Sequence, residues 1–85
     1  NMLSVSNPAL QQLHGSLPES TQANKCFRIV PRDEANLTLK YMEVAESDTT
    51  FEYQERPVLA LPKDLVPLCE NKSLDLNNEG QLELA

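Results

Sequence analysis

Two cysteines and one histidine are the residues of this sequence best suited to bind a metal or act as nucleophiles. Cys26 and Cys69 lie far apart in the chain, and His14 has no cysteine or histidine near it at ligand spacing. Structural zinc sites use closely spaced pairs of such ligands, and iron–sulfur clusters usually take four thiolates. We therefore interpret the cysteines as small buried hydrophobic residues and His14 as a residue at a helix end.

A second interpretation of the thiols stays open. Cys26 or Cys69 could contribute to an atypical iron site between two subunits of a dimer. Such a site would lack the four thiolates that are usual for clusters. It predicts that thiols of two subunits lie close together at an interface.

Acidic residues between positions 33 and 48 form the other candidate group. They could be drawn as a site for a hard cation, but their spacing does not resemble a calcium-binding loop. Acid–base catalysis would need one carboxyl group buried beside a cleft, and no arrangement of a nucleophile with a base is present. We expect a solvated face and no enzyme activity from this group, which consists of Asp33, Glu34, Glu43, Glu46 and Asp48.

Length and charge limit the class of protein. The chain has 85 residues, which predicts a single domain over residues 3–85, with residues 1–2 interpreted as a start that carries a vector remnant. Thirteen acidic and seven basic residues give a net charge of -6. Such a surface repels nucleic acid and anionic membrane. Without an export signal, two free thiols predict a protein of the reducing cytoplasm.

The apolar pattern predicts one N-terminal helix followed by five or six strands. Ser6-Asn7-Pro8 is typical of a helix start, and apolar residues then recur at helical spacing as far as Pro18. Strands are predicted over 25–31 and 36–45. In the second of these the apolar side chains change faces, which predicts a bulge near Tyr41 or Met42.

Residues 48–69 predict a strand, a turn, a second strand and a short helix. Pro57 predicts a turn at 55–57, and the four apolar residues 58–61 predict a strand covered on both faces. Asp64 is positioned to cap the short helix. Alternating leucines on either side of Asn77-Asn78-Glu79-Gly80 predict a final hairpin.

This order predicts an α+β, mostly β fold. We expect the N-terminal helix to pack on a bent antiparallel or mixed sheet, with one short helix between strands. Long helices do not alternate with the strands, which disfavours a doubly wound α/β fold.

Several short segments in this order resemble the HesB/IscA-like family, the A-type iron–sulfur carrier proteins. The resemblance covers residues 3–84, and its segments are Phe27-Arg28-Ile29 with Arg32, Asp48-Thr49-Thr50-Phe51-Glu52, Pro57-Val58-Leu59, Pro62-Lys63-Asp64-Leu65 with Leu68, and Leu74-Asp75-Leu76. It implies the β-sandwich or pseudo-barrel of that family.

The resemblance does not extend to the family's metal ligands. One family cysteine lies in a glycine-rich loop, whose position falls near Ala35 or Asn36, and two more form a Cys-Gly-Cys that would begin where this chain stops. Neither matches here, so the resemblance implies the fold but no cofactor. The altered loop is either a lost site or a new contact surface, and its candidate interaction residues are Arg32, Asp33, Glu34, Ala35 and Asn36.

These observations predict a non-catalytic HesB-like protein that has lost the cluster ligands. It would act through protein–protein interaction, either with itself as a homodimer or with components of iron–sulfur assembly. The alternative is an iron–sulfur assembly or iron-binding protein with an atypical site between subunits.

Overall fold

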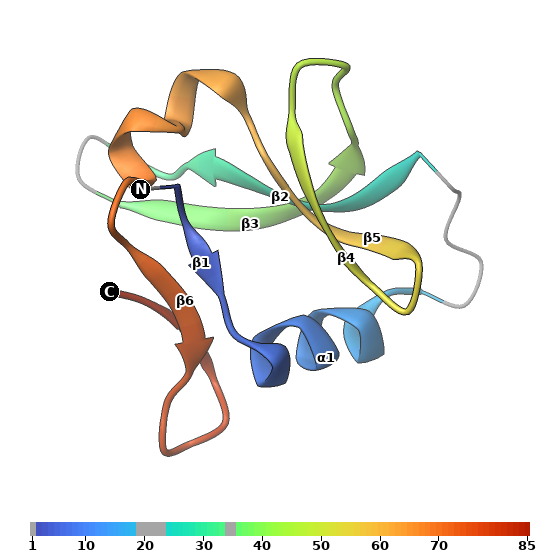
Figure 1. Cartoon of the computed structure of the whole chain (residues 1–85), viewed down its shortest axis with the longest axis vertical. Helices are drawn as coiled ribbons and strands as arrows, with labels where there is room; N and C mark the ends of the chain where they lie inside the picture. The colour runs from blue at the N-terminus through green and yellow to red at the C-terminus, as the bar shows by residue number, and fades with distance from the viewer. Residues whose placement is uncertain (1, 19–23, 34–35) are drawn as a thin grey trace.

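A computed structural model describes residues 2–18, 24–33 and 36–85 of the chain. In chain order the elements are β1 (Ser4–Val5), α1 (Asn7–Ser16), β2 (Lys25–Pro31), β3 (Leu37–Glu43), β4 (Thr49–Tyr53), β5 (Arg56–Leu61), the 3-10 turns η1 (Lys63–Leu65) and η2 (Pro67–Cys69), β6 (Ser73–Leu76) and β7 (Leu82–Leu84). The fold is α+β and mostly β, as the sequence predicts (Figure 1).

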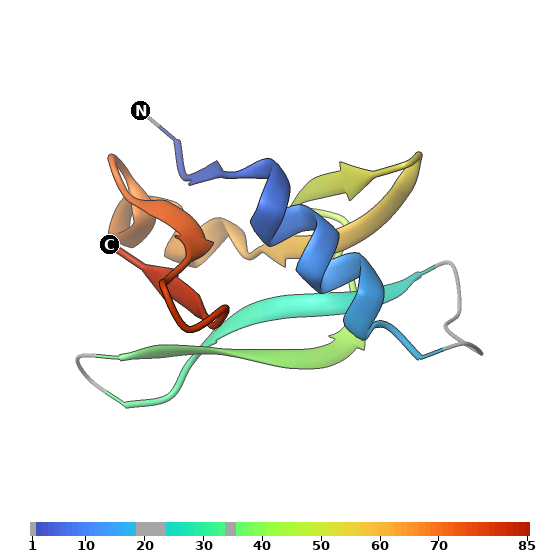
Figure 2. The same cartoon turned by 90° about the horizontal axis from the view of Figure 1, so that it is seen from below.

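The strands form two mixed sheets and not the single bent sheet that we expected. The larger sheet has the order β3-β2-β5-β4, and the smaller has the order β1-β6-β7. Strands β2 and β5 are parallel, as are β1 and β6, whereas the other pairs are antiparallel. Helix α1 packs against β4, β5 and β6 and so contacts both sheets (Figures 1 and 2). The described strands do not close into a barrel, because β3 and β7 each remain at a sheet edge.

Helix α1 begins where the sequence predicts. The Ser6 hydroxyl oxygen accepts a hydrogen bond from the Ala9 N–H group at 3.2 Å, and the same hydroxyl donates to Asp75 at 2.6 Å. The first bond satisfies a free N–H group of the first helical turn. The second attaches the start of the helix to β6. One face of α1 buries Ala9 and Leu13 in the core.

Strand β5 lies at the centre of the fold. Residues 58–61 of this strand are all fully buried, which confirms the prediction of a strand covered on both faces. Its core neighbours include Leu13 from the helix and Ile29 from β2. Pro62 follows at once and ends the strand, as expected.

The turn before β5 lies earlier than we predicted. Gln54 and Glu55 both have positive φ, at 53° and 67°, which is the geometry of a two-residue hairpin of type I′. Pro57 is therefore inside β5 and not in a turn. It lies beside a shift in the β4–β5 register between Phe51 and Glu52. Such an irregularity accommodates a residue that cannot donate a ladder hydrogen bond.

The predicted bulge in β3 is wrong. The β2–β3 register is continuous from Lys25 opposite Glu43 to Pro31 opposite Leu37. The apolar side chains of β3 change faces because, at the end of the β2–β3 hairpin away from its loop, each face of the sheet carries an apolar cross-strand pair. Phe27 lies opposite Tyr41, with the rings edge to face at 6.1 Å. Cys26 lies opposite Met42 on the other face.

The short helix between strands is a pair of 3-10 turns. Asp64 makes no capping hydrogen bond, because Pro62 occupies the cap position of η1. The prediction that Asp64 caps this segment is therefore wrong. Leu65 and Cys69 are buried, whereas Leu68 has 60% of its surface exposed.

An ion pair joins the turn before β4 to the middle of β2. The Arg28 guanidinium donates from Nε to Asp48 at 2.7 Å and from Nη2 at 2.9 Å, and the Ala45 N–H group donates to the same carboxylate at 3.0 Å. The Asp48 side chain has 0% exposure. The expected solvated face is therefore wrong for Asp48. The guanidinium hydrogen bonds lower the pKa of this carboxyl group, against the opposing effect of desolvation.

We predict that Asp48→Asn lowers the free energy of unfolding at neutral pH by about 1.5–3 kcal/mol, because it removes a doubly hydrogen-bonded charge. The pKa of Asp48 is lower in the folded state than in the unfolded state. The wild type therefore loses this contribution as the pH falls below about 4, whereas the variant has nothing to lose there. Urea denaturation across this pH range measures both effects. Glu46→Gln, in the exposed turn, is the control, and identical pH profiles for Asp48→Asn and wild type would contradict the prediction.

Candidate functional site

The candidate interaction loop connects β2 to β3. The backbone N–H groups of Arg32 and Asp33 donate to the Asn36 carbonyl at 2.9 and 3.4 Å. In return, the Asp33 carboxylate accepts from the Asn36 backbone at 2.9 Å and from its side-chain amide at 3.1 Å. Glu34 and Ala35 lie outside the described residues. The two ends of the loop are thus held together by reciprocal polar contacts.

This loop borders a hollow of about 660 Å³. Asp33 and Asn36 line it from the loop, and Leu68 lines it from η2. Leu82 and Leu84 line it from β7, which belongs to the other sheet. The fold therefore brings the predicted interaction loop together with the exposed leucine of η2 and the last strand.

A second hollow, of about 310 Å³, continues the first between the two sheets. The two hollows share Leu37, Leu82 and Leu84. We call their common cleft the β3–β7 groove and define it by Leu37, Leu39, Leu82 and Leu84. Figure 2 shows the red C-terminal strand β7 across from the β2–β3 hairpin. The leucines that define the groove come from β7 and from β3 of that hairpin. Buried Ile29 and Leu74 contribute to its lining.

Sequence reasoning missed the groove. It identified the alternating leucines as strand residues, which is correct, but an alternating pattern does not reveal whether the apolar face is covered. The sequence contains no signal for the groove, because it does not show which distant strands become neighbours. The sequence also does not mark Leu68 as exposed, because Leu68 lies in the same apolar segment as Leu65 and Val66.

The two cysteines are inside the protein. Cys26 in β2 and Cys69 at the end of η2 both have 0% exposure and are free thiols. Cys69 belongs to the core cluster around β5, and Cys26 does not. Burial and the nearby Asp48 carboxylate raise the pKa of Cys26 to about 11. Burial also raises the pKa of Cys69, with Lys72 acting in the opposite direction. The burial of both side chains agrees with their interpretation as small hydrophobic residues.

We predict that neither thiol of the folded protein reacts with Ellman's reagent at pH 8 on the time scale at which an exposed cysteine reacts fully. The reactive species is the thiolate, and burial lowers both its population and its accessibility. The absorbance of the released dye measures the reaction, and both thiols should react in concentrated urea. The variant Ser47→Cys places a thiol in an exposed turn and should react at once without urea. Equal rates for that thiol and the native ones would contradict the prediction.

His14 lies in the last turn of α1, as expected, and is half-buried. Its ring centroid is 5.3 Å from that of Tyr53, beside an open hollow of about 570 Å³ that is also lined by Gln11, Gln12 and Gln54. Among the described residues, no three side chains of His, Cys, Asp or Glu come together as a metal site. This hollow therefore presents amide and phenol groups, which can bind by hydrogen bonding.

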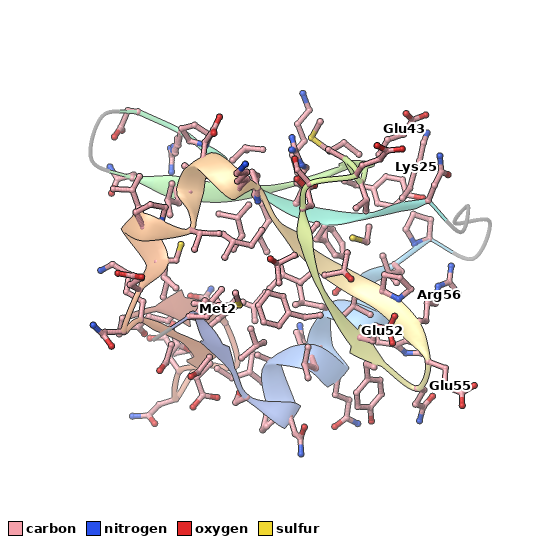
Figure 3. The ribbon with its side chains drawn as sticks, turned by 45° about the horizontal axis from the view of Figure 1, so that its top comes forward. Met2, Lys25, Glu43, Glu52, Glu55 and Arg56 are labelled. Atoms are coloured by element: carbon pink, nitrogen blue, oxygen red, sulfur yellow. The ribbon has the colours of Figure 1, made fainter. Side chains whose placement is uncertain are left out.

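The acidic candidates do not converge. Asp33 lies in the β2–β3 loop, Asp48 is paired with Arg28, and Glu46 is in an exposed turn. Figure 3 shows Glu43 beside Lys25, its partner across β2 and β3. Because the thiols are covered and the acidic side chains are spread apart, we take the β3–β7 groove as the candidate site. The chemistry that its leucines offer is apolar contact.

Comparisons of the chain with protein-family models, with curated proteins and with solved structures found no match. None of the described helices is long and apolar enough to cross a membrane.

Proposed function

We propose that this protein is a non-catalytic binding protein with a HesB-like fold, that it lacks iron–sulfur cluster ligands, and that it acts by contacting another protein. The observation that carries the proposal is the position of the β2–β3 loop. The resemblance assigns a family cysteine to this loop, and here the loop borders an apolar groove instead. The partner would be a component of iron–sulfur assembly, or a second copy of this chain, in a reducing cytoplasm.

The apolar lining of the groove supports this role. Leucines from both sheets lie in its walls, and Leu68 at its rim is one of two large hydrophobic residues that are well exposed in the described part of the chain. Apolar surface rimmed by polar groups is typical of protein contacts. Asp33 and Asn36 supply polar groups beside the groove, and their mutual hydrogen bonds hold them in place.

The alternative role, iron binding by thiols from two subunits, has less support. Cys26 and Cys69 are both fully covered, so a second subunit could reach either thiol only after local opening. Their raised pKa values disfavour the thiolate form that iron requires. Opening and deprotonation both add to the cost of metal binding.

We predict that anaerobic reconstitution with iron and sulfide yields no stable visible chromophore after desalting. A cluster needs several accessible thiolates, and this chain covers both of its own. Absorbance between about 300 and 600 nm, together with iron and sulfide analysis, measures the outcome. A Cys26→Ser, Cys69→Ser double variant sets the background. A chromophore in the wild type that the double variant loses would refute the proposal and favour the alternative.

We also predict that a photo-cross-linking amino acid in place of Arg32 captures a discrete partner in cells of the native host. Arg32 is exposed and follows directly on β2 at the start of the candidate loop. The matched control places the same group at Glu79, in the exposed turn between β6 and β7. Denaturing gels and mass spectrometry identify the product. Equal labelling from both positions, or from neither, would contradict a contact surface at this loop.

A further inference from the structure

The edge of β7 that faces away from β6 has backbone groups available for pairing. Ser73 and Ala85 exchange two hydrogen bonds of 2.9 Å, and the Asn77 N–H group donates to Gln81 at 2.8 Å. In an antiparallel ladder, bonded and non-bonded pairs alternate. Leu82 and Leu84 therefore occupy the non-bonded pairs, so their N–H and C=O groups point away from β6. Strand β7 ends the order of its sheet, and in the described chain no strand lies on its other side.

Strand β3 repeats this arrangement on the opposite wall of the groove. The Val44 N–H group donates to Asn24 at 2.8 Å, and that of Arg32 donates to Asn36 at 2.9 Å. The continuous β2–β3 register then places Leu37 and Leu39 in non-bonded pairs. Both walls thus combine an apolar side chain with outward-pointing backbone groups at the same residues.

Charge distinguishes the two edges. Glu83 lies between Leu82 and Leu84 and is exposed at the groove rim, where Asp33 also lies. Lys40, the exposed cation of β3, does not line either hollow of the groove. Lys72 is the basic residue of the rim. The whole chain carries a net charge of -6, so its field favours a cationic partner.

We propose that the β3–β7 groove binds an extended segment of a partner protein, which adds as a fourth strand along β7. This inference rests on the proposed binding function and specifies the chemistry of the partner. Residues of the segment opposite Leu82 and Leu84 are apolar and fill the groove against Leu37 and Leu39. The residue between them, opposite Glu83, is Lys or Arg, because opposite charges across two strands are favourable.

A second copy of this chain fits the same edge poorly. Antiparallel pairing of β7 with itself, centred on its middle residue, places Glu83 directly opposite Glu83 of the other copy. Like charges in directly opposite positions destabilise a sheet. Two chains that each carry a charge of -6 also repel each other. The occupant of this groove is therefore a different protein.

The test is to pan a display library of random nine-residue peptides against the immobilised full chain. We expect the enriched peptides to alternate apolar residues with Lys or Arg and to bind with extended conformation. Fluorescence anisotropy then measures the affinity of the best peptide for four variants. Glu83→Lys should weaken binding about five-fold or more, because it replaces an attractive pair with a repulsive one. Glu79→Lys changes the net charge equally, but in the hairpin turn, and should weaken binding less than about two-fold.

The second pair of variants tests the backbone contact. Leu84→Pro removes the N–H group that points away from β6 and leaves the β6 ladder intact, whereas Leu84→Ala shortens the side chain but keeps the N–H group. We expect the proline variant to bind about three- to ten-fold more weakly than the alanine variant, as for loss of one hydrogen bond. Circular dichroism establishes that each variant is folded. In spectra of labelled wild type, amide shifts should centre on residues 82–84.

The outcomes separate this inference from the proposed function. Strand addition would be refuted if the peptide bound Glu83→Lys as tightly as Glu79→Lys, and Leu84→Pro as tightly as Leu84→Ala. Amide shifts centred on His14 and Tyr53 would refute it as well. If no peptide is enriched although Arg32 gives its cross-link, strand addition is refuted and protein binding stands. If both fail, the proposed function fails as well.

Discussion

Strand β5 has four consecutive residues without exposed surface, Val58–Leu61, and the rest of the fold is arranged to cover them. Parallel β2 and antiparallel β4 flank it in the sheet, and α1 packs against it. Burying a leucine is worth about 1.5–3 kcal/mol, so this one strand accounts for a large share of the stability available to a small domain. The space between β3 and β7 is less completely filled and holds a hollow of about 310 Å³.

Electrostatics adds a long-range contact to this core. Arg28 and Asp48 are distant in the chain, yet their paired hydrogen bonds attach the turn before β4 to β2. Arg28 lies on β2, the strand that also carries Cys26, and the covered Asp48 carboxylate helps to raise the pKa of that thiol. Packing and charge therefore act together to make the thiol a structural residue.

Much of the fold could be predicted from local patterns. The Ser6 cap, the buried β5 and the final hairpin follow from residue types and spacing that act over a few positions. The turn was misplaced because Pro57 suggested a turn, whereas the positive φ of Gln54 and Glu55 leaves no trace in residues that are neither glycine nor asparagine. The groove and the Arg28–Asp48 pair could not be predicted, because each depends on which distant strands become neighbours.

The pairing of β1 with β6 also affects how the protein folds during its synthesis on the ribosome. Ser4 lies opposite Ser73, so the smaller sheet joins residues near the two ends of the described chain (Figure 1). The larger sheet can assemble once β5 has emerged, but β1 must wait for the segment that contains β6. Contacts of such long sequence separation slow folding. During this interval the apolar face of α1 is only partly buried. A chaperone that recognises exposed leucines would bind the chain at this stage.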